Sequence, residues 1–210
     1  MVDTILNTVP EKKEIHILIV GPSWIVGMFP NRQLRTYEKS LEEKLGVPVS
    51  LDVVAKVGEG VGWMQKQLQQ TLATHPNDHY DYVLFFPGRN DIMRKRTGDI
   101  TQSISDTLGL LRDVGRVFVF NIQYSDKRLL GDHTYKVGRI NDFLQNLVGG
   151  DSHISILDLY SYTRQHGLGY PLHPSVRGYT KLRKWTIDTV ASQLVKADNL
   201  PTPKTRLLRL

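Results

Sequence analysis

Four short motifs in this sequence carry the residue types that acyl transfer requires. Ser23, which follows a Gly-Pro pair, could supply an attacking hydroxyl, and His173, which precedes a Pro-Ser pair, could accept its proton. Gly58 opens a Gly-Glu-Gly-Val-Gly cluster, and Asn90 lies in the motif Gly-Arg-Asn-Asp. A backbone amide and a side-chain amide are donors that can stabilise a developing oxyanion. Together these four residues predict a serine-based acyl-transfer site.

The chain around these motifs alternates between short apolar runs and amphipathic stretches. The apolar runs, which are rich in β-branched residues, predict strands at residues 15–21, 50–57, 81–86, 116–120 and 154–157. The amphipathic stretches predict helices at residues 34–45, 63–74, 100–113, 135–148 and 178–195. This alternation predicts a three-layer α/β/α fold, in which helices cover both faces of a five-stranded parallel sheet.

The motifs follow the predicted strands. Ser23 comes after the first strand, Gly58 after the second and Asn90 after the third, while His173 follows the fifth strand and a loop. The carboxyl ends of parallel strands meet at one edge of a sheet, where helix N-termini also point. We therefore expect the Ser23 hydroxyl and the His173 imidazole to meet in one crevice at this edge.

In this order, the four motifs resemble those of the SGNH or GDSL hydrolases, and the resemblance covers about residues 15–195. A Gly-Tyr pair opens the last predicted helix, as it does in that family. The resemblance implies a flavodoxin-like SGNH hydrolase fold, with Ser23 as the nucleophile and His173 as the base. It implies an oxyanion hole formed by the amides of Ser23 and Gly58 and the side chain of Asn90. The implied substrates are acetyl or other short acyl esters on carbohydrate or lipid, and no metal or cofactor is implied.

The sequence departs from the family pattern at two positions. Tyr170 stands where the family has an Asp three residues before the histidine, and Pro22 replaces the Asp of the Gly-Asp-Ser motif. In serine proteases, neutralising the carboxylate behind the histidine lowers turnover by roughly 10⁴-fold. A backbone carbonyl, the Tyr170 hydroxyl or an acid from another loop, such as Asp132, could take its place. The prediction is therefore a serine ester hydrolase that uses either a Ser-His dyad or a rebuilt triad.

Each motif also has a simpler interpretation. Ser23 could cap the first helix, and Asn90 and Asp91 could cap a turn. Asp91 is expected to brace its loop in preference to supporting the histidine. The alternative to an esterase is a catalytically inactive protein of the same fold that serves as a binding or structural component of a larger assembly.

The charge is basic, with 27 Lys and Arg against 21 Asp and Glu. Residues 196–210 hold four bases and one acid, so half of the net charge of +6 lies in this segment. The basic run at residues 94–96 is either a solvated loop or a flank of the site that favours an anionic substrate or a phosphate backbone. Nucleic-acid binding is the weaker of these predictions. The absence of cysteine excludes disulfides, thiolate nucleophiles and Cys-ligated metals.

The expected domain organisation is simple. An N-terminal extension covers residues 1–14, the hydrolase-like domain covers residues 15–196, and a basic tail covers residues 197–210. The tail is a candidate for docking on a protein or another acidic partner. No run of about 20 apolar residues and no signal peptide are visible, so we expect a soluble protein and favour the cytoplasm.

Overall fold

The structure is a computed structural model. It describes residues 14–30, 33–74, 80–149, 151–168 and 173–198, without the side chains of Lys127, Asp132, Ala197 and Asp198. The predicted N-terminal extension, apart from its last residue, and the predicted tail beyond Asp198 lie outside the described residues. None of the helices in the described part of the chain is long and apolar enough to span a membrane.

Five parallel strands form one sheet in the order β2-β1-β3-β4-β5. They are β1 (Ile15–Gly21), β2 (Val49–Ala55), β3 (Tyr82–Phe85), β4 (Arg116–Phe120) and β5 (Ile154–Leu157). This is the strand order of flavodoxin-like sheets. The three-layer fold that the sequence predicted is therefore confirmed.

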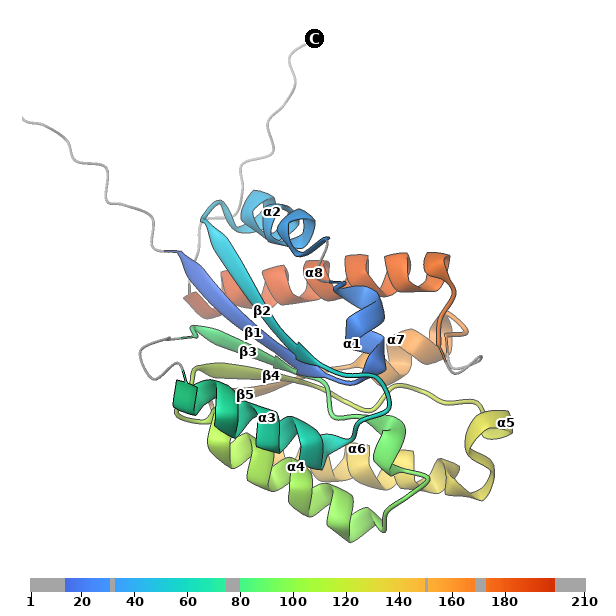
Figure 1. The fold of residues 1–210 in the computed structure, drawn as a ribbon. Coiled ribbons are helices and arrows are strands. Elements are labelled where there is room, and N and C mark those ends of the chain that lie inside the picture. The colour runs from blue at the N-terminus through green and yellow to red at the C-terminus, as the bar shows by residue number, and fades with distance from the viewer. Residues whose placement is uncertain (1–13, 31–32, 75–79, 150, 169–172, 199–210) are drawn as a thin grey trace, which may run out of the picture.

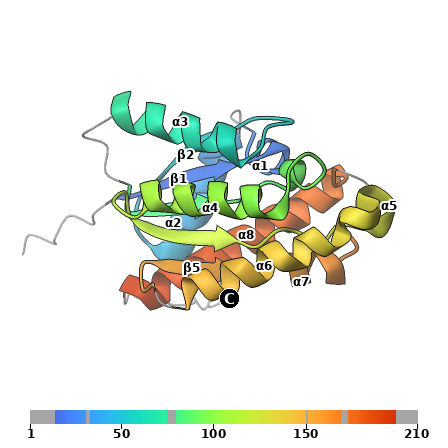
Figure 2. The same cartoon turned by 90° about the horizontal axis from the view of Figure 1, so that it is seen from below.

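Helices cover both faces of the sheet, as Figures 1 and 2 show. The face with α1 (Ser23–Met28), α2 (Leu34–Leu45), α7 (Leu159–Gln165) and α8 (Val176–Asp198) lies above the sheet in Figure 1. The opposite face carries α3 (Val61–Thr74), α4 (Thr97–Leu111) and α6 (Thr134–Val148). Short helical turns, η2 (Arg89–Asp91), α5 (Lys127–Leu130) and η3 (Gly131–His133), lie in the loops after β3 and β4.

Each face of the sheet has its own hydrophobic core. In β1, Ile17 and Ile19 pack into the cluster under α2 and α8, whereas Leu18 and Val20 pack into the cluster under α3 and α4. Because successive strand residues point to opposite faces, both sides of the central strand are buried, which explains its continuous apolar run. Replacing such a buried aliphatic residue with Ala is expected to cost about 2–5 kcal/mol.

Several helix starts differ from the prediction: α4 begins at Thr97 instead of residue 100, and α6 begins at Thr134 instead of residue 135. The helix predicted from residue 63 begins at Val61, because the Asp91 carboxylate accepts its backbone N–H at 2.7 Å. The last helix begins at Val176 instead of residue 178, after Ser175, whose hydroxyl accepts the N–H of Gly178 at 3.2 Å. The seven-residue α7 was not predicted, because it is too short to show a helical period; Asp158 caps it by accepting the Ser161 N–H.

Candidate active site

Ser23 and His173 contact each other at the carboxyl edge of the sheet, by which we mean the loops and first helical turns that follow the strands. The Oγ atom of Ser23 lies 2.9 Å from Nε2 of His173, although the residues are 150 positions apart in the sequence. Ser23 is buried, with 8% of its surface exposed, whereas His173 is exposed. The hydroxyl thus belongs to a buried residue, whereas the imidazole belongs to an exposed one.

The turn after β1 fixes the position of Ser23. A Cβ atom at Gly21 would overlap the Ile25 side chain, so the strand can pass this closely to α1 only with glycine. Pro22 is the N-cap residue of α1 in an extended conformation, and its carbonyl accepts the N–H of Ile25 at 2.9 Å. Ser23 is therefore the first residue of the helix and not its cap, and its hydroxyl faces His173.

The N-terminus of α8 fixes the position of His173. Ser175 accepts the Gly178 N–H with its hydroxyl and the Tyr179 N–H with its carbonyl, at 3.2 Å and 2.9 Å. A Cβ atom at Gly178 would be 2.8 Å from Cβ of Pro174, which is closer than real Cβ contacts. Glycine at this position thus lets the histidine-bearing segment pack against its own helix.

A second close approach joins α1, which begins with Ser23, to α8, which follows His173. A Cβ atom at Gly27 in α1 would overlap the ring of Tyr179 in α8. The aromatic ring therefore lies directly on the backbone of α1, one helical turn after Ser23. This contact is a point of close packing between α1, which begins with Ser23, and α8, which follows His173.

Asn90 lies beside the loop that follows β2. Its Nδ2 atom donates to the Glu59 carbonyl at 2.7 Å. A carboxamide has two N–H bonds, so one remains for another acceptor. Gly58 adopts a left-handed conformation with φ of 80°, and its carbonyl accepts a hydrogen bond from Arg94 at 3.2 Å. Asn90 is thus in direct contact with the carbonyl of Glu59, one position after the glycine that the family resemblance favours.

Asp91 braces the same loop. Its carboxylate accepts the Val61 N–H at 2.7 Å and pairs with Lys95 at 2.9 Å, and it is almost completely buried. A Cβ atom at Gly60 would overlap this carboxylate, so the middle glycine of the cluster is the one that permits the close approach. The described hydrogen bonds of Asp91 stay within this brace and do not include His173.

The side chains of Tyr170 and Asp132, the two residues proposed to replace the family's aspartate, are not described. Tyr170 lies in the segment 169–172, and of Asp132 only the backbone, in η3, is described. Among the described residues, Ser23 is the hydrogen-bond partner of the His173 ring. No group of three or more metal-ligating side chains lies close enough together there to hold a metal ion.

Arg89 is a buried cation next to Asn90 that the sequence did not reveal. Its guanidinium donates to Ser125 Oγ at 2.8 Å and lies 5.9 Å from the centre of the Trp24 ring. Burial lowers the pKa of Arg89 to about 10, and the phenol of Tyr179 acts in the opposite direction. Burial also raises the pKa of Tyr179. The arginine remains charged at neutral pH, and a sequence motif cannot show that such a side chain is buried.

The basic run after Asn90 divides between the site and solvent. Arg94 donates to the Gly58 carbonyl and Lys95 pairs with Asp91, so both hold the loop between β2 and α3. Arg96 pairs at 3.1 Å with Asp99, which lies one turn further along α4, and both side chains are exposed. Two of the three cations therefore flank the candidate site.

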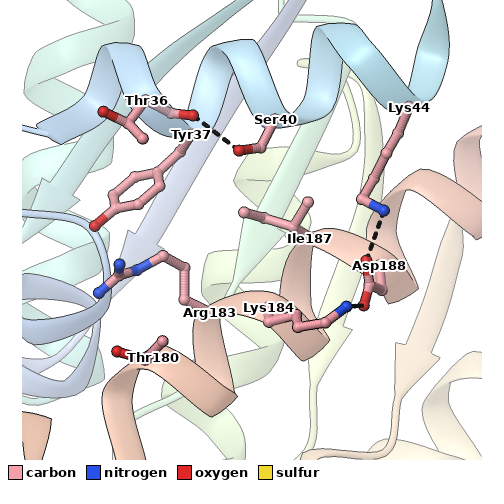
Figure 3. A pocket seen from close by; sticks show the side chains of 9 residues that line it. All are labelled: Thr36, Tyr37, Ser40, Lys44, Thr180, Arg183, Lys184, Ile187 and Asp188. Carbon is pink, nitrogen blue, oxygen red and sulfur yellow. Dashed lines mark hydrogen bonds and ion pairs between the residues drawn. The ribbon is translucent and has the colours of Figure 1, made fainter. Parts of the chain in front are cut away.

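Two cavities of the described structure are lined by neither Ser23 nor His173. A narrow cavity of about 10 Å³ lies behind α1, between Trp24, Phe86 and Phe120. A wider groove of about 240 Å³ lies between α2 and α8 (Figure 3). Its cations are already engaged, because Lys44 and Lys184 both pair with Asp188. The groove includes neither Ser23 nor His173 and is not part of the candidate site.

No protein-family model and no curated protein matches the sequence. Solved structures do match the fold. A member of the lipolytic protein G-D-S-L family from Veillonella parvula superposes with a TM-score of 0.68 at 17% identity, over 83% of this chain and 97% of that chain. A lipase/acylhydrolase from Enterococcus faecalis gives 0.65 at 16% identity, over 85% and 96%.

An acetylxylan esterase from Geobacillus stearothermophilus has the same fold, with a TM-score of 0.66 at 11% identity, over 84% of this chain and 94% of that chain. At these identities the similarity establishes the fold alone. The fold of the GDSL and SGNH hydrolases, which the sequence motifs implied, is therefore confirmed. It is a fold shared by lipases, esterases and acylhydrolases.

Proposed function

We propose that this protein is a serine ester hydrolase of the SGNH type, in which Ser23 and His173 form the reacting pair. The observation that carries the proposal is the 2.9 Å contact between Ser23 Oγ and His173 Nε2. This is the geometry that general-base activation of a hydroxyl requires. For Nε2 to accept the serine proton, the neutral imidazole must carry its own proton on Nδ1.

The proposed reaction has two halves. Ser23 Oγ attacks the acyl carbon while His173 Nε2 takes the hydroxyl proton, and the carbonyl π electrons move onto the carbonyl oxygen. His173 then gives the proton to the departing alcohol, which leaves an acyl ester on Ser23. A water molecule, deprotonated by His173, attacks this ester in the same way and releases the carboxylic acid and the free serine.

Three donors are proposed for the oxyanion. Ser23 is the first residue of α1, and helix geometry leaves its amide without an acceptor inside the helix. The second N–H of the Asn90 amide is available after the bond to Glu59. The third donor is an amide of the loop between β2 and α3, for which the family resemblance favours Gly58. The buried charge of Arg89, the neighbour of Asn90, favours negative charge in this region.

The substrate proposal follows from the fold neighbours. They include an acetylxylan esterase and lipases, so short acyl esters on carbohydrate or lipid are the substrates to test first. We propose a Ser-His dyad for the described residues, with Tyr170 and Asp132 as the groups to test for a supporting role behind the imidazole.

A fluorophosphonate probe, which reacts with activated serines, tests the proposal directly. The wild-type protein should be labelled and should hydrolyse p-nitrophenyl acetate, whereas Ser23→Ala should show neither. His173→Gln should reduce both by at least about 10⁴-fold. Ser125→Ala is the matched control, since it removes a nearby buried hydroxyl that is bonded to Arg89 and not to His173. Labelling that persists in Ser23→Ala would refute the assignment.

The second candidate is a protein of this fold that binds its ligand without hydrolysing it. It is favoured by the Asn90 amide, which is partly occupied by the Glu59 carbonyl, and by the substitution of Tyr170 for the usual acid. For this candidate, the wild-type protein remains unlabelled by the probe and inactive on short esters while it is fully folded.

A further inference from the structure

The exposed large hydrophobic residues of the described chain share one location. They are Val26, Val57, Met93, Tyr135 and Val176, with exposed fractions of 37%, 62%, 52%, 56% and 86%. Isolated exposed hydrophobic residues are ordinary on protein surfaces and need no explanation. These five residues, however, all follow the carboxyl ends of strands and are not scattered over the surface.

Each of the five follows a different strand at the carboxyl edge of the sheet. Val26 lies in α1 after β1, and Val57 lies in the loop after β2. Met93 follows η2, which comes after β3. Tyr135 lies in the first turn of α6 after β4, and Val176 begins α8 after β5 and α7. In Figure 1 this edge is the right-hand end of the sheet, where α1, α5 and α7 lie.

Contacts between neighbouring segments bring these residues together in two pairs. Arg94, the neighbour of Met93, donates to Gly58, the neighbour of Val57, so these two loops touch. Gly27, the neighbour of Val26, lies under Tyr179 in the first turns of α8, close to Val176. Val57 and Met93 therefore lie in two loops that touch each other, and Val26 and Val176 lie in the two helices that touch near the Ser-His pair.

Basic residues are interleaved with the apolar ones. The Arg139 guanidinium lies 5.6 Å from the centre of the Tyr135 ring. Arg177 directly follows Val176, and Arg94 directly follows Met93; all three arginines are exposed. Lys56 precedes Val57 and lies 5.6 Å from the centre of the Trp63 ring.

The acids of this edge neutralise Lys56 but not the arginines beside the apolar residues. Asp158, which follows β5, adds one negative charge, and its carboxylate accepts hydrogen bonds from Asn121 and Ser161. Glu59 pairs with Lys56 at 3.2 Å, Asp99 with Arg96 at 3.1 Å, and Asp126 with Arg128 at 2.9 Å. Among the described side chains, Arg94, Arg139 and Arg177 have no such acidic partner. The edge is therefore both apolar and positively charged.

We propose that the carboxyl edge docks on an anionic lipid surface, with the five apolar side chains entering the interface and the arginines contacting acidic head groups. Interleaved basic and apolar side chains are the combination that binds the surface of anionic membranes without crossing them. A protein or nucleic-acid partner would account for the charge, but apolar residues spread over five separate segments suit a deformable interface better. The inference goes beyond the proposed hydrolysis, because docking does not require Ser23 to react.

The test measures co-sedimentation of the full chain with vesicles. The Ser23→Ala variant is used so that turnover does not alter the lipid, and the vesicles are either phosphatidylcholine alone or phosphatidylcholine mixed with phosphatidylglycerol. We expect binding to the anionic vesicles that weakens as salt is added. Arg139→Gln and Arg177→Gln should each weaken binding about fivefold, and Val57→Ser with Met93→Ser should weaken it about tenfold.

Arg112→Gln is the matched control, because it removes an exposed arginine at the opposite edge of the sheet. It should bind the vesicles like the parent, and circular dichroism should show that every variant is folded. Equal binding to the two kinds of vesicle, no binding, or equal loss in the control would overturn the proposal. Binding to polyglutamate or to single-stranded DNA in place of the vesicles would also overturn it and would indicate a macromolecular partner.

Discussion

The two edges of the sheet are built from the same five strands but differ in what their loops do. At the amino edge the loops are short and bond to one another: Asp81 donates its N–H to the His16 carbonyl at 2.9 Å and accepts the His16 N–H on its carboxylate at 3.0 Å. Arg112 pairs with Asp151 across the same edge at 3.0 Å. At the carboxyl edge the loops instead present Ser23, His173 and the exposed apolar residues.

The difference follows from the direction of the chain. Every strand ends at the carboxyl edge and every following helix begins there, so helix N-termini and their unbonded amides converge at that edge alone. The amino edge receives helix C-termini and only has to return the chain to the sheet. Substitutions of the candidate site residues at the carboxyl edge should therefore change activity. Substitutions at the amino edge, or of residues that only brace a loop or cap a helix, should change stability at most.

After substitution of the Ser-His pair itself, the largest expected effect comes from Asn90→Ala. If the second N–H of this amide binds the oxyanion, ester hydrolysis should fall by about 10²–10³-fold, with most of the loss in kcat. The steady-state kinetics of p-nitrophenyl acetate hydrolysis measure this. Asn146→Ala, which removes an exposed amide from the far part of α6, is the control. A loss no greater than that of the control would remove Asn90 from the oxyanion hole.

Gly27→Ala tests the contact between α1 and α8. The added methyl group overlaps the Tyr179 ring, so the helices must separate and Ser23 must move relative to His173. Activity should fall by roughly 10²-fold, and the free energy of unfolding should fall by about 1–3 kcal/mol. Chemical denaturation and ester kinetics measure the two effects.

A second substitution distinguishes this packing effect from general damage. Tyr179→Leu removes the ring atoms that the new methyl group meets, so activity and stability should partly return in the double variant. Gly109→Ala, at a position in α4 with nothing within 4 Å, should instead raise stability by up to about 1 kcal/mol. A double variant as inactive as Gly27→Ala would show that the contact does not set the geometry of the pair.

Asp158→Ala should affect stability without changing the site. Burial raises the pKa of Asp158, but hydrogen bonds from Ser161 and Asn121 outweigh this effect and lower it below the ordinary value. Its contribution is therefore complete above its unfolded pKa, about 4, and is lost as the pH falls through its lower folded value. The loss at neutral pH should be about 1 kcal/mol.

Denaturation curves at neutral and acidic pH measure this difference. It should narrow as the pH falls, and Asp158→Asn, which retains an oxygen for the Ser161 N–H, should lose less than the alanine variant. A difference that is constant with pH would show that the carboxylate charge does not contribute.

Arg112→Gln, at the amino edge, should have the smallest effect. It breaks an ion pair whose arginine is well exposed, and such pairs contribute up to about 1 kcal/mol. Ester hydrolysis should stay within about twofold of the wild type. A large loss of activity in this variant would contradict the claim that residues at the amino edge affect stability and not activity.

The strands were predicted well because a strand that is buried on both faces is a nearly continuous apolar run in the sequence. The predicted strands at residues 116–120 and 154–157 agree with β4 and β5 to the residue. Helix starts were predicted less well, because long-range contacts set them: α3 begins at Val61 through a carboxylate 30 positions away. Such a partner has no periodic signal near the helix that it caps.

At the site, the motifs named residues but not their contacts. Ser23 could equally have capped a helix; the structure makes Pro22 the N-cap and turns the hydroxyl toward His173. Among the glycines after β2, the sequence singled out Gly58, whereas the close approach to a buried carboxylate occurs at Gly60. The burial of Arg89 had no sequence signal.

The sequence alone determined the order of strands and helices and the edge at which the four motifs would gather, because hydrophobic period and chain direction are local properties. Only the tertiary structure decided that two atoms 150 residues apart lie within 2.9 Å, and that the exposed large apolar side chains of the described residues follow the strand ends. Those outcomes depend on how closely α1 and α8 pack and on which side chains the loops leave exposed. Both are set by contacts between distant segments, which no local pattern records.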